Sequence, residues 1–511
     1  MLNKSFFLSQ VFFLLSFSAW ADSIDIDTTV CSSSLEYLEG LILKQDDSLL
    51  CATYPEVAVK SRKVKSQRTN FSHALQLHYS PDDATKSDYL IIAKRSLYDS
   101  LSIDLKMYSE DVHAIFGYGI YLETVTDDTP ETIKSLICSY GNRLCGVLLV
   151  GNIASAFYEV ENDHNLYGYR HWPCDLFYMD LDGIWTDSDS NGKYDSHTGN
   201  VAPEIFLGRL SAYGLSSYGS EVELIRNQLQ KSHKYWWKES FHVQETSLNY
   251  KDIDFRRYFS PNYIKKVFST EYITEIRNEV DSCFSASDYI TRISSNVYGF
   301  THLAAHSSPI HHEFTRGDTV EGIFNIDIKD IDSNNYAYSL YCCSACNWTA
   351  GNSNGYLGGA YLFNKGKTIA VVGTTKTGGM KSASIKHFYS QLESNNLGEA
   401  YCYWWNQLGN IHSHSIICWN YGMTLLGDPT IDFRYKVSNR CVNDLTLTSF
   451  PSENSSNLIV YKAGNSITVS NSFTIPQGVH VVFDAPQVVI ENGFICPIGY
   501  SFEIRSEGCE L

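Results

Sequence analysis

Positive charge is scarce in this chain of 511 residues. Lysine and arginine together number 39, against 57 aspartates and glutamates, and the formal net charge is −18. Binding to nucleic acid needs clustered basic side chains, so this balance argues against nucleic acid as a partner. The sequence also lacks a Gly-x-Gly-x-x-Gly or Walker-type phosphate loop, so neither nucleotide binding nor an organic cofactor is expected.

Long apolar runs are also rare. After residue 21 no segment approaches 18 consecutive apolar residues, so a transmembrane helix is not expected. The first residues differ, because Lys4 precedes an apolar stretch from Phe6 to Phe17 and Ala19-Trp20-Ala21 offers the small residues of a cleavage site. This pattern predicts a signal peptide at residues 1–21 and a secreted protein, whether extracellular, periplasmic or at the cell surface.

Cysteine, in contrast, is abundant, with 14 residues spread along the chain. An oxidising compartment favours disulfide bonds, although their connectivity cannot be deduced from sequence. The candidates close in sequence are Cys31 with Cys51, Cys138 with Cys145, and Cys496 with Cys509. Together with 35 tyrosines, 26 phenylalanines and 9 tryptophans, these cysteines indicate an exported globular protein.

Changes in composition divide the rest of the chain into parts. Residues 22–85 are mixed and polar, and we interpret them as an N-terminal arm or leader. From residue 86 to 436, apolar runs alternate with segments of helical spacing, which predicts an α/β domain with a largely parallel sheet flanked by helices. This region forms one unit or two sub-domains. Residues 442–511 contain short β-branched alternations, typical of a small all-β module.

The alternation of strands and helices is clearest in the first third of the α/β region. Tyr89–Ala93 is a continuous apolar run, as in a strand buried on both faces, and residues at helical spacing follow it. Thr129 and Pro130 suit the N-cap and first position of a second helix, which we expect to end at Gly141. Further strands are predicted at 118–125, 147–151, 205–210, 299–306, 339–346 and 368–375.

Two of these predicted strands end in reactive residues. The first stops at His306 and enters a loop at Ser307, and the second stops at Cys346. Catalytic groups of parallel sheets gather at the carboxyl ends of strands, so the thiol and the imidazole can meet there. His306 would generate the thiolate and protonate a leaving amine, and the backbone N–H groups of Ser307 and Cys346 would face an oxyanion. A disulfide at Cys346 and a structural histidine stay open as alternatives.

The order of these motifs resembles the gingipain-type cysteine peptidases, which share the caspase-like fold. The likeness covers about residues 88–436, because further stretches match beside the two strand ends. These stretches are Asp88–Ile92, Leu148–Gly151, Asp175–Gly183, Glu204–Arg209, Ile369–Thr374 and Leu426–Pro429. The resemblance implies a caspase-like sheet and a peptidase acting on protein or peptide substrates, with Cys346 as nucleophile and His306 as its partner.

Two single residues need separate comment, because Ser307 departs from the family pattern and Asp175 matches it. The family usually has glycine after the histidine, whereas this chain has Ser307, which keeps the backbone N–H. In the family, an aspartate matching Asp175 lies at the base of the pocket for the residue before the cut. The resemblance therefore implies cleavage after Arg or Lys, which pair well with a buried carboxylate. A turn cap after Pro173 is the simpler role for Asp175.

An acidic insertion carries a separate motif. Residues 187–195 have oxygen ligands at positions 1, 3, 5 and 9 and glycine at position 6, as in a calcium-binding loop. The candidate ligands of a structural Ca²⁺ are Asp187, Asp189, Asn191, the carbonyl of Lys193, and Asp195. Position 12 is Thr198 instead of glutamate, so an acidic surface turn is the alternative.

One main hypothesis and two alternatives follow from these patterns. The main hypothesis is a secreted, calcium-stabilised cysteine endopeptidase. The first alternative is a non-catalytic surface binding or adhesion protein on the same scaffold, and the second is a transpeptidase or self-processing enzyme with the same dyad. The C-terminal β module fits all three, as a spacer or a surface attachment.

Overall fold

The computed structural model describes the α/β region and the C-terminal strands. The described residues are 88–509 without 127, 238–246, 252–272, 279, 317, 351–354, 381, 393, 434–441, 451–457, 471, 477–478 and 498–500. The predicted signal peptide at 1–21 and the predicted arm at 22–85 lie outside them. Among the described helices, none combines the length and the apolar composition that crossing a membrane requires.

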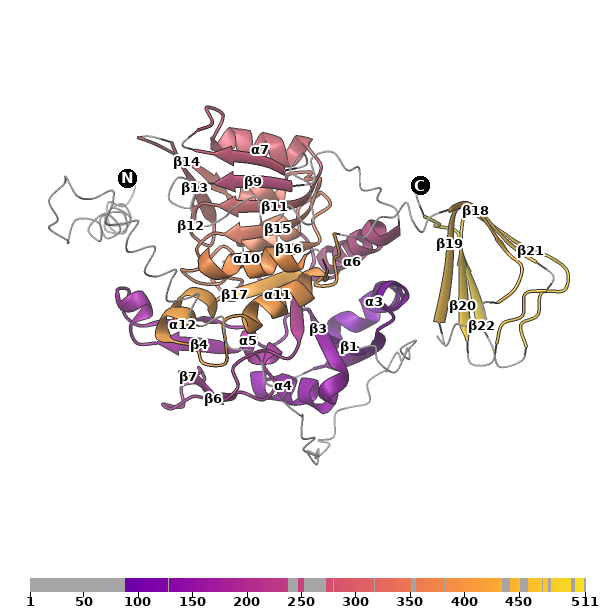
Figure 1. Cartoon of the computed structure of the whole chain (residues 1–511), viewed down its shortest axis with the longest axis horizontal. Helices are drawn as coiled ribbons and strands as arrows, with labels where there is room; N and C mark the ends of the chain where they lie inside the picture. The colour runs from indigo at the N-terminus through magenta and orange to yellow at the C-terminus, as the bar shows by residue number, and fades with distance from the viewer. Residues whose placement is uncertain are drawn as a thin grey trace. The chain divides into compact units, whose positions relative to one another are not determined.

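One ten-stranded sheet forms the centre of the α/β region (Figure 1). Its strands lie in the order β10, β9, β11, β15, β16, β17, β8, β3, β1, β2. Neighbours are parallel, except that β16 and β17 pair antiparallel, so two parallel halves run in opposite directions. In the same order, the strands span Ile273–Arg277, Ser247–Lys251, Tyr298–Ala304, Asn335–Tyr341, Ala370–Thr374, Met423–Gly427, Phe206–Leu210, Leu144–Val150, Asp88–Lys94 and Gly119–Val125.

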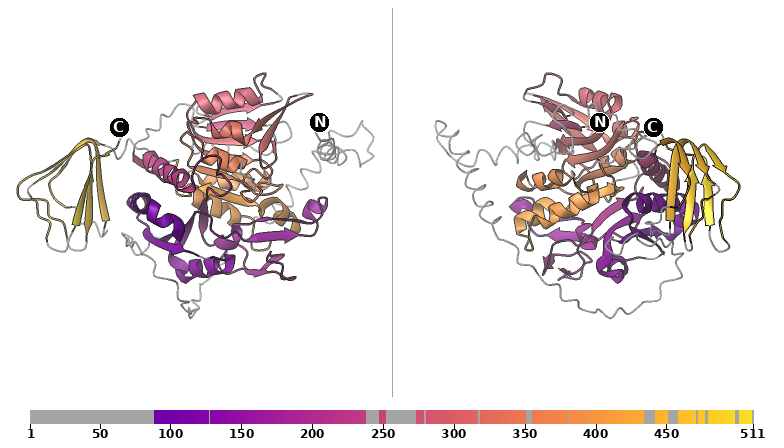
Figure 2. Two further views of the ribbon diagram at one scale, coloured as in Figure 1. Left: turned by 180° about the vertical axis from the view of Figure 1, so that it is seen from behind. Right: turned by 45° about the vertical axis from the view of Figure 1, so that its right-hand side comes forward.

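Both faces of the sheet are buried, because alternate residues of a strand enter different hydrophobic clusters. In β1, Tyr89, Ile91 and Ala93 belong to one cluster, and Leu90 and Ile92 belong to the other. The first cluster includes side chains of α3, α7 and α9, and the second includes side chains of α4, α10 and α11. Helices thus flank the sheet on both faces, as the sequence predicts (Figure 2). These helices span Arg95–Phe116, Ala286–Ser295, Leu357–Leu362, Pro130–Ser139, Ser382–Gln391 and Leu397–Asn406.

Helix α4 begins at the residue that the sequence predicts. The Thr129 side chain accepts a hydrogen bond from the backbone N–H of Thr132 at 3.3 Å, and Pro130 is the first helical residue. The helix ends at Ser139, and Gly141 follows with φ +74°, a left-handed conformation that glycine adopts without strain. Capping groups beside an amphipathic segment are therefore enough to predict this helix.

The strand that leads to the predicted nucleophile ends earlier than predicted. β15 stops at Tyr341, whereas the prediction continues it to Cys346. Beyond Tyr341 the chain turns, and Ser344 adopts a left-handed conformation with φ 58°. The backbone N–H of Ser344 donates to the carbonyl of Lys376 at 2.8 Å, and that of Cys346 donates to Thr374 at 2.9 Å. The turn is thus bonded to the end of β16, and Cys346 lies beyond it.

Short antiparallel units extend from the loops. β12 (His306–Ser307), β13 (His311–Arg316) and β14 (Thr319–Phe324) form a three-stranded unit directly after β11. β4 pairs with β5, and β6 pairs with β7 on either side of the acidic insertion. Among the described residues, this region also contains β4 (Phe157–Val160), β5 (Arg170–Pro173), α5 (Leu176–Met179), β6 (Ile184–Thr186), β7 (Ser196–Thr198), α6 (Glu221–Trp237), α8 (Asn325–Lys329) and α12 (His414–Asn420).

The C-terminal residues form strands only. β19 pairs in parallel with β18, β20 and β21, and β20 pairs in parallel with β22. These strands enclose a hydrophobic core of their own, which includes Ile467, Phe473, Val481 and Phe483. The strands β18–β22 span Val442–Leu447, Leu458–Val469, His480–Asp484, Gln487–Ile490 and Ser501–Arg505.

Two of the predicted disulfides are wrong. Cys138, Cys145 and Cys496 are free thiols. Cys138 lies near the end of α4 with its Sγ 3.8 Å from the Leu181 carbonyl, whereas Cys145 is a residue of β3, so proximity in sequence does not bring their sulfurs together. The predicted pair of Cys31 and Cys51 lies outside the described residues.

Candidate active site

The carboxyl ends of β11, β15 and β16 lie next to one another at one edge of the sheet (Figure 1). The residues that follow these ends carry imidazole, thiol and ammonium groups. They are His306 after β11, Cys342 and Cys343 after β15, and Lys376 after β16. Reactive groups of parallel sheets gather at such an edge, so we take it as the candidate active site.

His306 is half-buried and begins β12. Its partner in the register with β13 is Glu313. His311 Nε2 lies 3.0 Å from Glu313 Oε1, and this bond lowers the pKa of Glu313, with the charge of His306 contributing. Glu313 thus supplies negative charge beside His306. Sequence reasoning missed this residue, because only the pairing of β12 with β13 brings it to the histidine.

The Cys346 thiol is buried in the hydrophobic core. Its residue has no exposed surface, and its sulfur lies so close to Gly358 and Gly373 that a Cβ there would be 2.8 and 2.5 Å away. Burial raises the pKa of the Cys346 thiol well above its usual value. Cys346 therefore packs as a small apolar side chain, and the structure does not place it at the sheet edge with His306.

Cys343 is half-buried at the turn that follows β15. Burial raises the pKa of its thiol, while a hydrogen bond from the Gly378 backbone and the charge of Lys376 act in the opposite direction. Lys376 Nζ is itself held 2.8 Å from Asp163 Oδ1 in a buried ion pair. The charge of Lys376 thus favours the thiolate form of Cys343.

Alternation along β11 and β15 places the last residues of the two strands, Ala304 and Tyr341, on the same face of the sheet. On this face His302 of β11 and Ser339 of β15 are in contact, with 3.3 Å between Nδ1 and Oγ. The residues two further along, at the ends of both strands, lie in the same hydrophobic cluster. Two residues beyond these ends are His306, which begins β12, and Cys343, which lies in the turn after β15. Cys342 and Cys346 belong to the cluster on the opposite face.

Of the two backbone N–H groups predicted for the oxyanion, one is already used. The N–H of Cys346 donates to the Thr374 carbonyl at 2.9 Å, so it is not available to a substrate. Ser307 lies in β12 beside His306, with its Oγ 2.7 Å from His312 Nδ1. Its backbone N–H stays a prediction for this role.

Asp175 lies in the interior and is paired within the chain. Arg209 donates to it twice, from Nη2 at 2.6 Å and from Nε at 3.1 Å, and the Thr424 hydroxyl donates at 2.9 Å. Asp175 and Arg209 are 3% and 1% exposed, so no cationic substrate side chain reaches the carboxylate. The prediction that Asp175 receives Arg or Lys of a substrate is therefore wrong. Sequence reasoning missed Arg209 as its partner, because the two residues meet only in the folded sheet.

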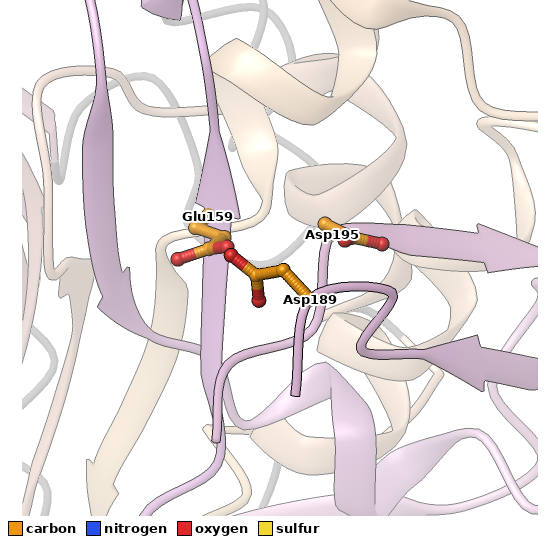
Figure 3. Close-up of side chains that lie close together, drawn as sticks. All are labelled: Glu159, Asp189 and Asp195. Atoms are coloured by element: carbon orange, nitrogen blue, oxygen red, sulfur yellow. The ribbon is translucent and has the colours of Figure 1, made fainter. Parts of the chain in front are cut away.

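The predicted calcium loop brings carboxylates together. Oxygens of Asp189 and Asp195 lie with an oxygen of Glu159, a residue of β4, within 4.8 Å of one another (Figure 3). Asp187 accepts hydrogen bonds from the backbone N–H groups of Asn191 at 3.1 Å and Gly192 at 2.8 Å, which close the turn. Glu159 comes from outside the motif and adds a third carboxylate to this cluster.

Neighbouring side chains donate a hydrogen bond and bring a positive charge to Glu159. The Tyr169 hydroxyl donates to Glu159 Oε2 at 2.6 Å, and Lys193 Nζ lies 3.6 Å from the same oxygen. The candidate metal-ligand atoms are hard oxygens of carboxylates, an amide and a backbone carbonyl. Ca²⁺ prefers such oxygen ligands. The residues present therefore fit a calcium ion.

The comparisons with known proteins agree with this architecture. The model of peptidase family C25 matches residues 82–434. The crystal structure of the Arg-specific cysteine proteinase gingipain R (RgpB) is similar at 14% identity and a TM-score of 0.50, over 72% of this chain and 84% of that chain. A complex of the Porphyromonas gingivalis RgpB pro- and mature domains is similar at 13% identity and a TM-score of 0.50, over 71% and 84%. No curated protein matches the chain significantly.

These similarities differ in what they establish. At such low identity, the likeness to solved structures shows the fold alone. The family match covers more than half of the chain and includes the whole ten-stranded sheet. The chain belongs to peptidase family C25, the gingipain family, and is a cysteine-type peptidase that acts on peptide substrates.

Proposed function

We propose that the chain is an endopeptidase with Cys343 as nucleophile and His306 as general base. The observation that carries the choice of thiol is burial: Cys343 is half-buried at the sheet edge, whereas Cys346 has no exposed surface. A nucleophile must touch its substrate, so a thiol enclosed by Gly358 and Gly373 is unsuited to the role. The pairing of His306 with Cys346 is the competing assignment.

The proposed reaction follows from the groups at this edge. His306 accepts the proton of the Cys343 thiol, and the thiolate attacks the peptide carbonyl carbon, moving an electron pair onto the oxygen. When the C–N bond breaks, His306 protonates the leaving amine. Water then loses a proton to His306 and attacks the thioester, which releases the acid and restores the thiol. Lys376 stabilises the thiolate, Glu313 the imidazolium, and the Ser307 N–H the oxyanion.

Mapping a covalent probe tests this function. A peptidyl acyloxymethyl ketone, which alkylates the thiolate of cysteine peptidases, is incubated with the full chain and the modified peptide is identified by mass spectrometry. We expect modification of Cys343, and its loss after unfolding the protein before labelling, because only the folded site aligns the thiol with His306. Modification of Cys346 would support the competing dyad, and a native protein that reacts nowhere would contradict the function.

The proposed substrate class is a flexible protein segment, and Asp175 does not select the residue before the cut. The net charge of −18 attracts basic segments over distance, an effect that physiological salt screens within about 8 Å. Cleavage after Arg or Lys would need a carboxylate other than Asp175, which Arg209 neutralises. Sequencing the products of a peptide library measures the preference, and cleavage spread over many residue types would exclude basic specificity.

We also propose that Glu159, Asp189 and Asp195 bind a structural Ca²⁺ together with Asp187, Asn191 and the Lys193 carbonyl. The support is the combination of the loop sequence with a carboxylate from β4 that replaces the missing ligand at position 12. The ion would hold the loop against β4. It takes no part in the proposed reaction.

Removing calcium is expected to lower the melting temperature. An ion that binds only the folded chain stabilises it by about 2.7 kcal/mol at a concentration one hundred times its dissociation constant. Chelator-treated protein should therefore melt several degrees below the Ca²⁺-loaded protein, and Glu159→Gln or the pair Asp187→Ala with Asp189→Ala should abolish the difference. Asp99→Ala, an exposed carboxylate elsewhere, is the control. Identical wild-type melting curves with and without chelator would leave the loop as a surface turn.

For localisation, we propose secretion after removal of residues 1–21, with the C-terminal strands as an attachment or spacer. The support is the sequence pattern around Phe6–Phe17 and Ala19–Ala21. N-terminal sequencing of the protein from the culture medium or cell surface should begin at Asp22. An intact Met1 on the exported protein would contradict the cleavage.

A further inference from the structure

A lysine and an aspartate are buried side by side on the C-terminal strands. Lys462 of β19 and Asp484 of β20 are partners in the register of these two parallel strands. Lys462 Nζ lies 2.6 Å from Asp484 Oδ2, and the two side chains are 2% and 0% exposed. Removing both charges from water is costly, and apolar side chains of similar size often give equal or greater stability. A gain in stability alone therefore does not account for this enclosed pair.

The second carboxylate oxygen of Asp484 has different partners. Asp484 Oδ1 accepts hydrogen bonds from the backbone N–H groups of Glu507 at 3.0 Å and Gly508 at 2.7 Å. These bonds hold the carboxylate with Oδ1 toward the backbone and Oδ2 toward Lys462. Two backbone N–H groups on one oxygen are also the arrangement that stabilises an oxyanion when a nucleophile attacks the carbon beside it.

The buried pair of Lys376 with Asp163 gives a comparison. Lys376 Nζ lies 2.8 Å from Asp163 Oδ1 and also donates to two backbone carbonyls, at 2.8 and 2.5 Å. Three acceptors engage the three protons of this ammonium group, so the loss of a proton would break a hydrogen bond. Among the described residues, Lys462 Nζ has one hydrogen-bond acceptor, Asp484. The Lys462 pair can therefore rearrange its protons without losing another bond.

We propose that Lys462 and Asp484 join in an intramolecular isopeptide bond, a covalent cross-link between β19 and β20. In the first step Nζ passes a proton to Oδ2 over the 2.6 Å between them, which turns the ion pair into an amine and a carboxylic acid. Because burial disfavours charged groups, this transfer costs less here than in water. The strands hold the two groups in place, so the reaction needs no further alignment.

The amine then acts as the nucleophile. Its lone pair forms the C–N bond to the carboxyl carbon of Asp484, and an electron pair moves onto Oδ1, beside the N–H groups of Glu507 and Gly508. When this electron pair returns, the bond between the carbon and Oδ2 breaks. The oxygen leaves as water, with the proton that it already carries and a second proton from the nitrogen. The products are one amide and one water, and both buried charges are removed.

The cross-link changes how the C-terminal strands respond to proteolysis. A cut between residues 462 and 484 leaves β19 and β20 joined, which suits a chain that is itself a peptidase and meets its own activity. A cross-link also favours the folded form, because it restricts the unfolded chain. The bond forms without Cys343 or His306, so its test does not depend on the proposed nucleophile.

Trypsin digestion of the purified full chain tests the bond. Lys462 is the single lysine or arginine in residues 441–504, so trypsin divides residues 441–505 at this position unless the amine is blocked. After reduction and unfolding, we expect one undivided peptide 441–505 whose mass is lower by one water. Chymotrypsin, which cleaves at Phe473 between the two partners, should then leave two peptides joined through Lys462 and Asp484. Lys376 and Asp163 are the internal control and should carry no cross-link.

Lys462→Arg is the matched variant, because it keeps a positive charge beside Asp484 and removes the reactive amine. Its digest should show the full mass, with no loss of water in this region. A wild-type digest in which peptide 441–462 appears with its full mass would overturn the proposed bond, and this measurement decides even if the variant does not fold. Loss of water that persists in Lys462→Arg would also overturn it, because the dehydration would then lie at another residue.

Discussion

Cys343→Ala is expected to lower kcat/KM by at least about 10⁴-fold, whereas Cys346→Ala should leave it within a few-fold of the wild type. Removing a nucleophile removes the whole covalent route, because nucleophile and base act as a unit. Removing the Cys346 sulfur leaves a small cavity among Gly358, Gly373 and Leu340 and costs about 1–2 kcal/mol of stability. The measurement is the initial rate of cleavage of a fluorogenic peptide well below the melting temperature.

Cys342→Ala is the matched control for this pair of variants. Cys342 precedes Cys343, but it belongs to the opposite face and its Sγ lies 3.5 Å from the Leu303 carbonyl. The reverse result, an inactive Cys346→Ala beside an active Cys343→Ala, would restore the dyad predicted from the sequence. Loss of activity in Cys342→Ala alone would move the nucleophile to that residue.

Asp175→Asn is expected to lower the free energy of unfolding by about 3–5 kcal/mol without changing the cleavage preference. The substitution keeps the size of the side chain but removes its charge, and it leaves the buried Arg209 guanidinium without a counter-ion. Specificity should not change, because the carboxylate is enclosed and already paired. The measurements are chemical unfolding and the product pattern from a peptide library.

A double variant separates the loss of the pair from the loss of packing. Asp175→Leu combined with Arg209→Met replaces both charges by apolar groups, and such replacements are often neutral or stabilising, so it should recover most of the lost stability. Asp99→Asn, at an exposed carboxylate, should change stability by less than about 0.5 kcal/mol. If Asp175→Asn instead reduced cleavage after Arg or Lys and left stability unchanged, Asp175 would be the specificity residue after all.

Local patterns predict the elements of this fold well. The apolar run Tyr89–Ala93 is a buried strand, and the Thr129 cap with Pro130 begins a helix, because both signals act between residues a few positions apart. The family motifs identify the peptidase family, which the match over residues 82–434 confirms. The acidic motif likewise marks the loop in which Asp189 and Asp195 lie close to Glu159, and its binding of calcium stays a prediction.

The assignments that fail depend on residues far apart or on a turn. The sequence predicts a strand that continues to Cys346, but the left-handed Ser344, whose N–H donates to the Lys376 carbonyl, turns the chain. Cys346 is buried beyond this turn. Since side chains alternate only along a strand, the end of β15 at Tyr341 means that the pattern does not extend to Cys343 and Cys346.

The pairing of charges in the site also depends on residues that are far apart in sequence. Composition and short motifs determine that this chain is an acidic α/β cysteine peptidase with a terminal β module, because hydrophobic periodicity and backbone capping are local. Tertiary packing decides which partner each carboxylate has. Arg209 neutralises Asp175, and Glu313 lies opposite His306 in the pairing of β12 with β13. Glu159 of β4 lies beside the carboxylates of the acidic loop. Electrostatic interactions act through space, and the spacing along the chain does not record them.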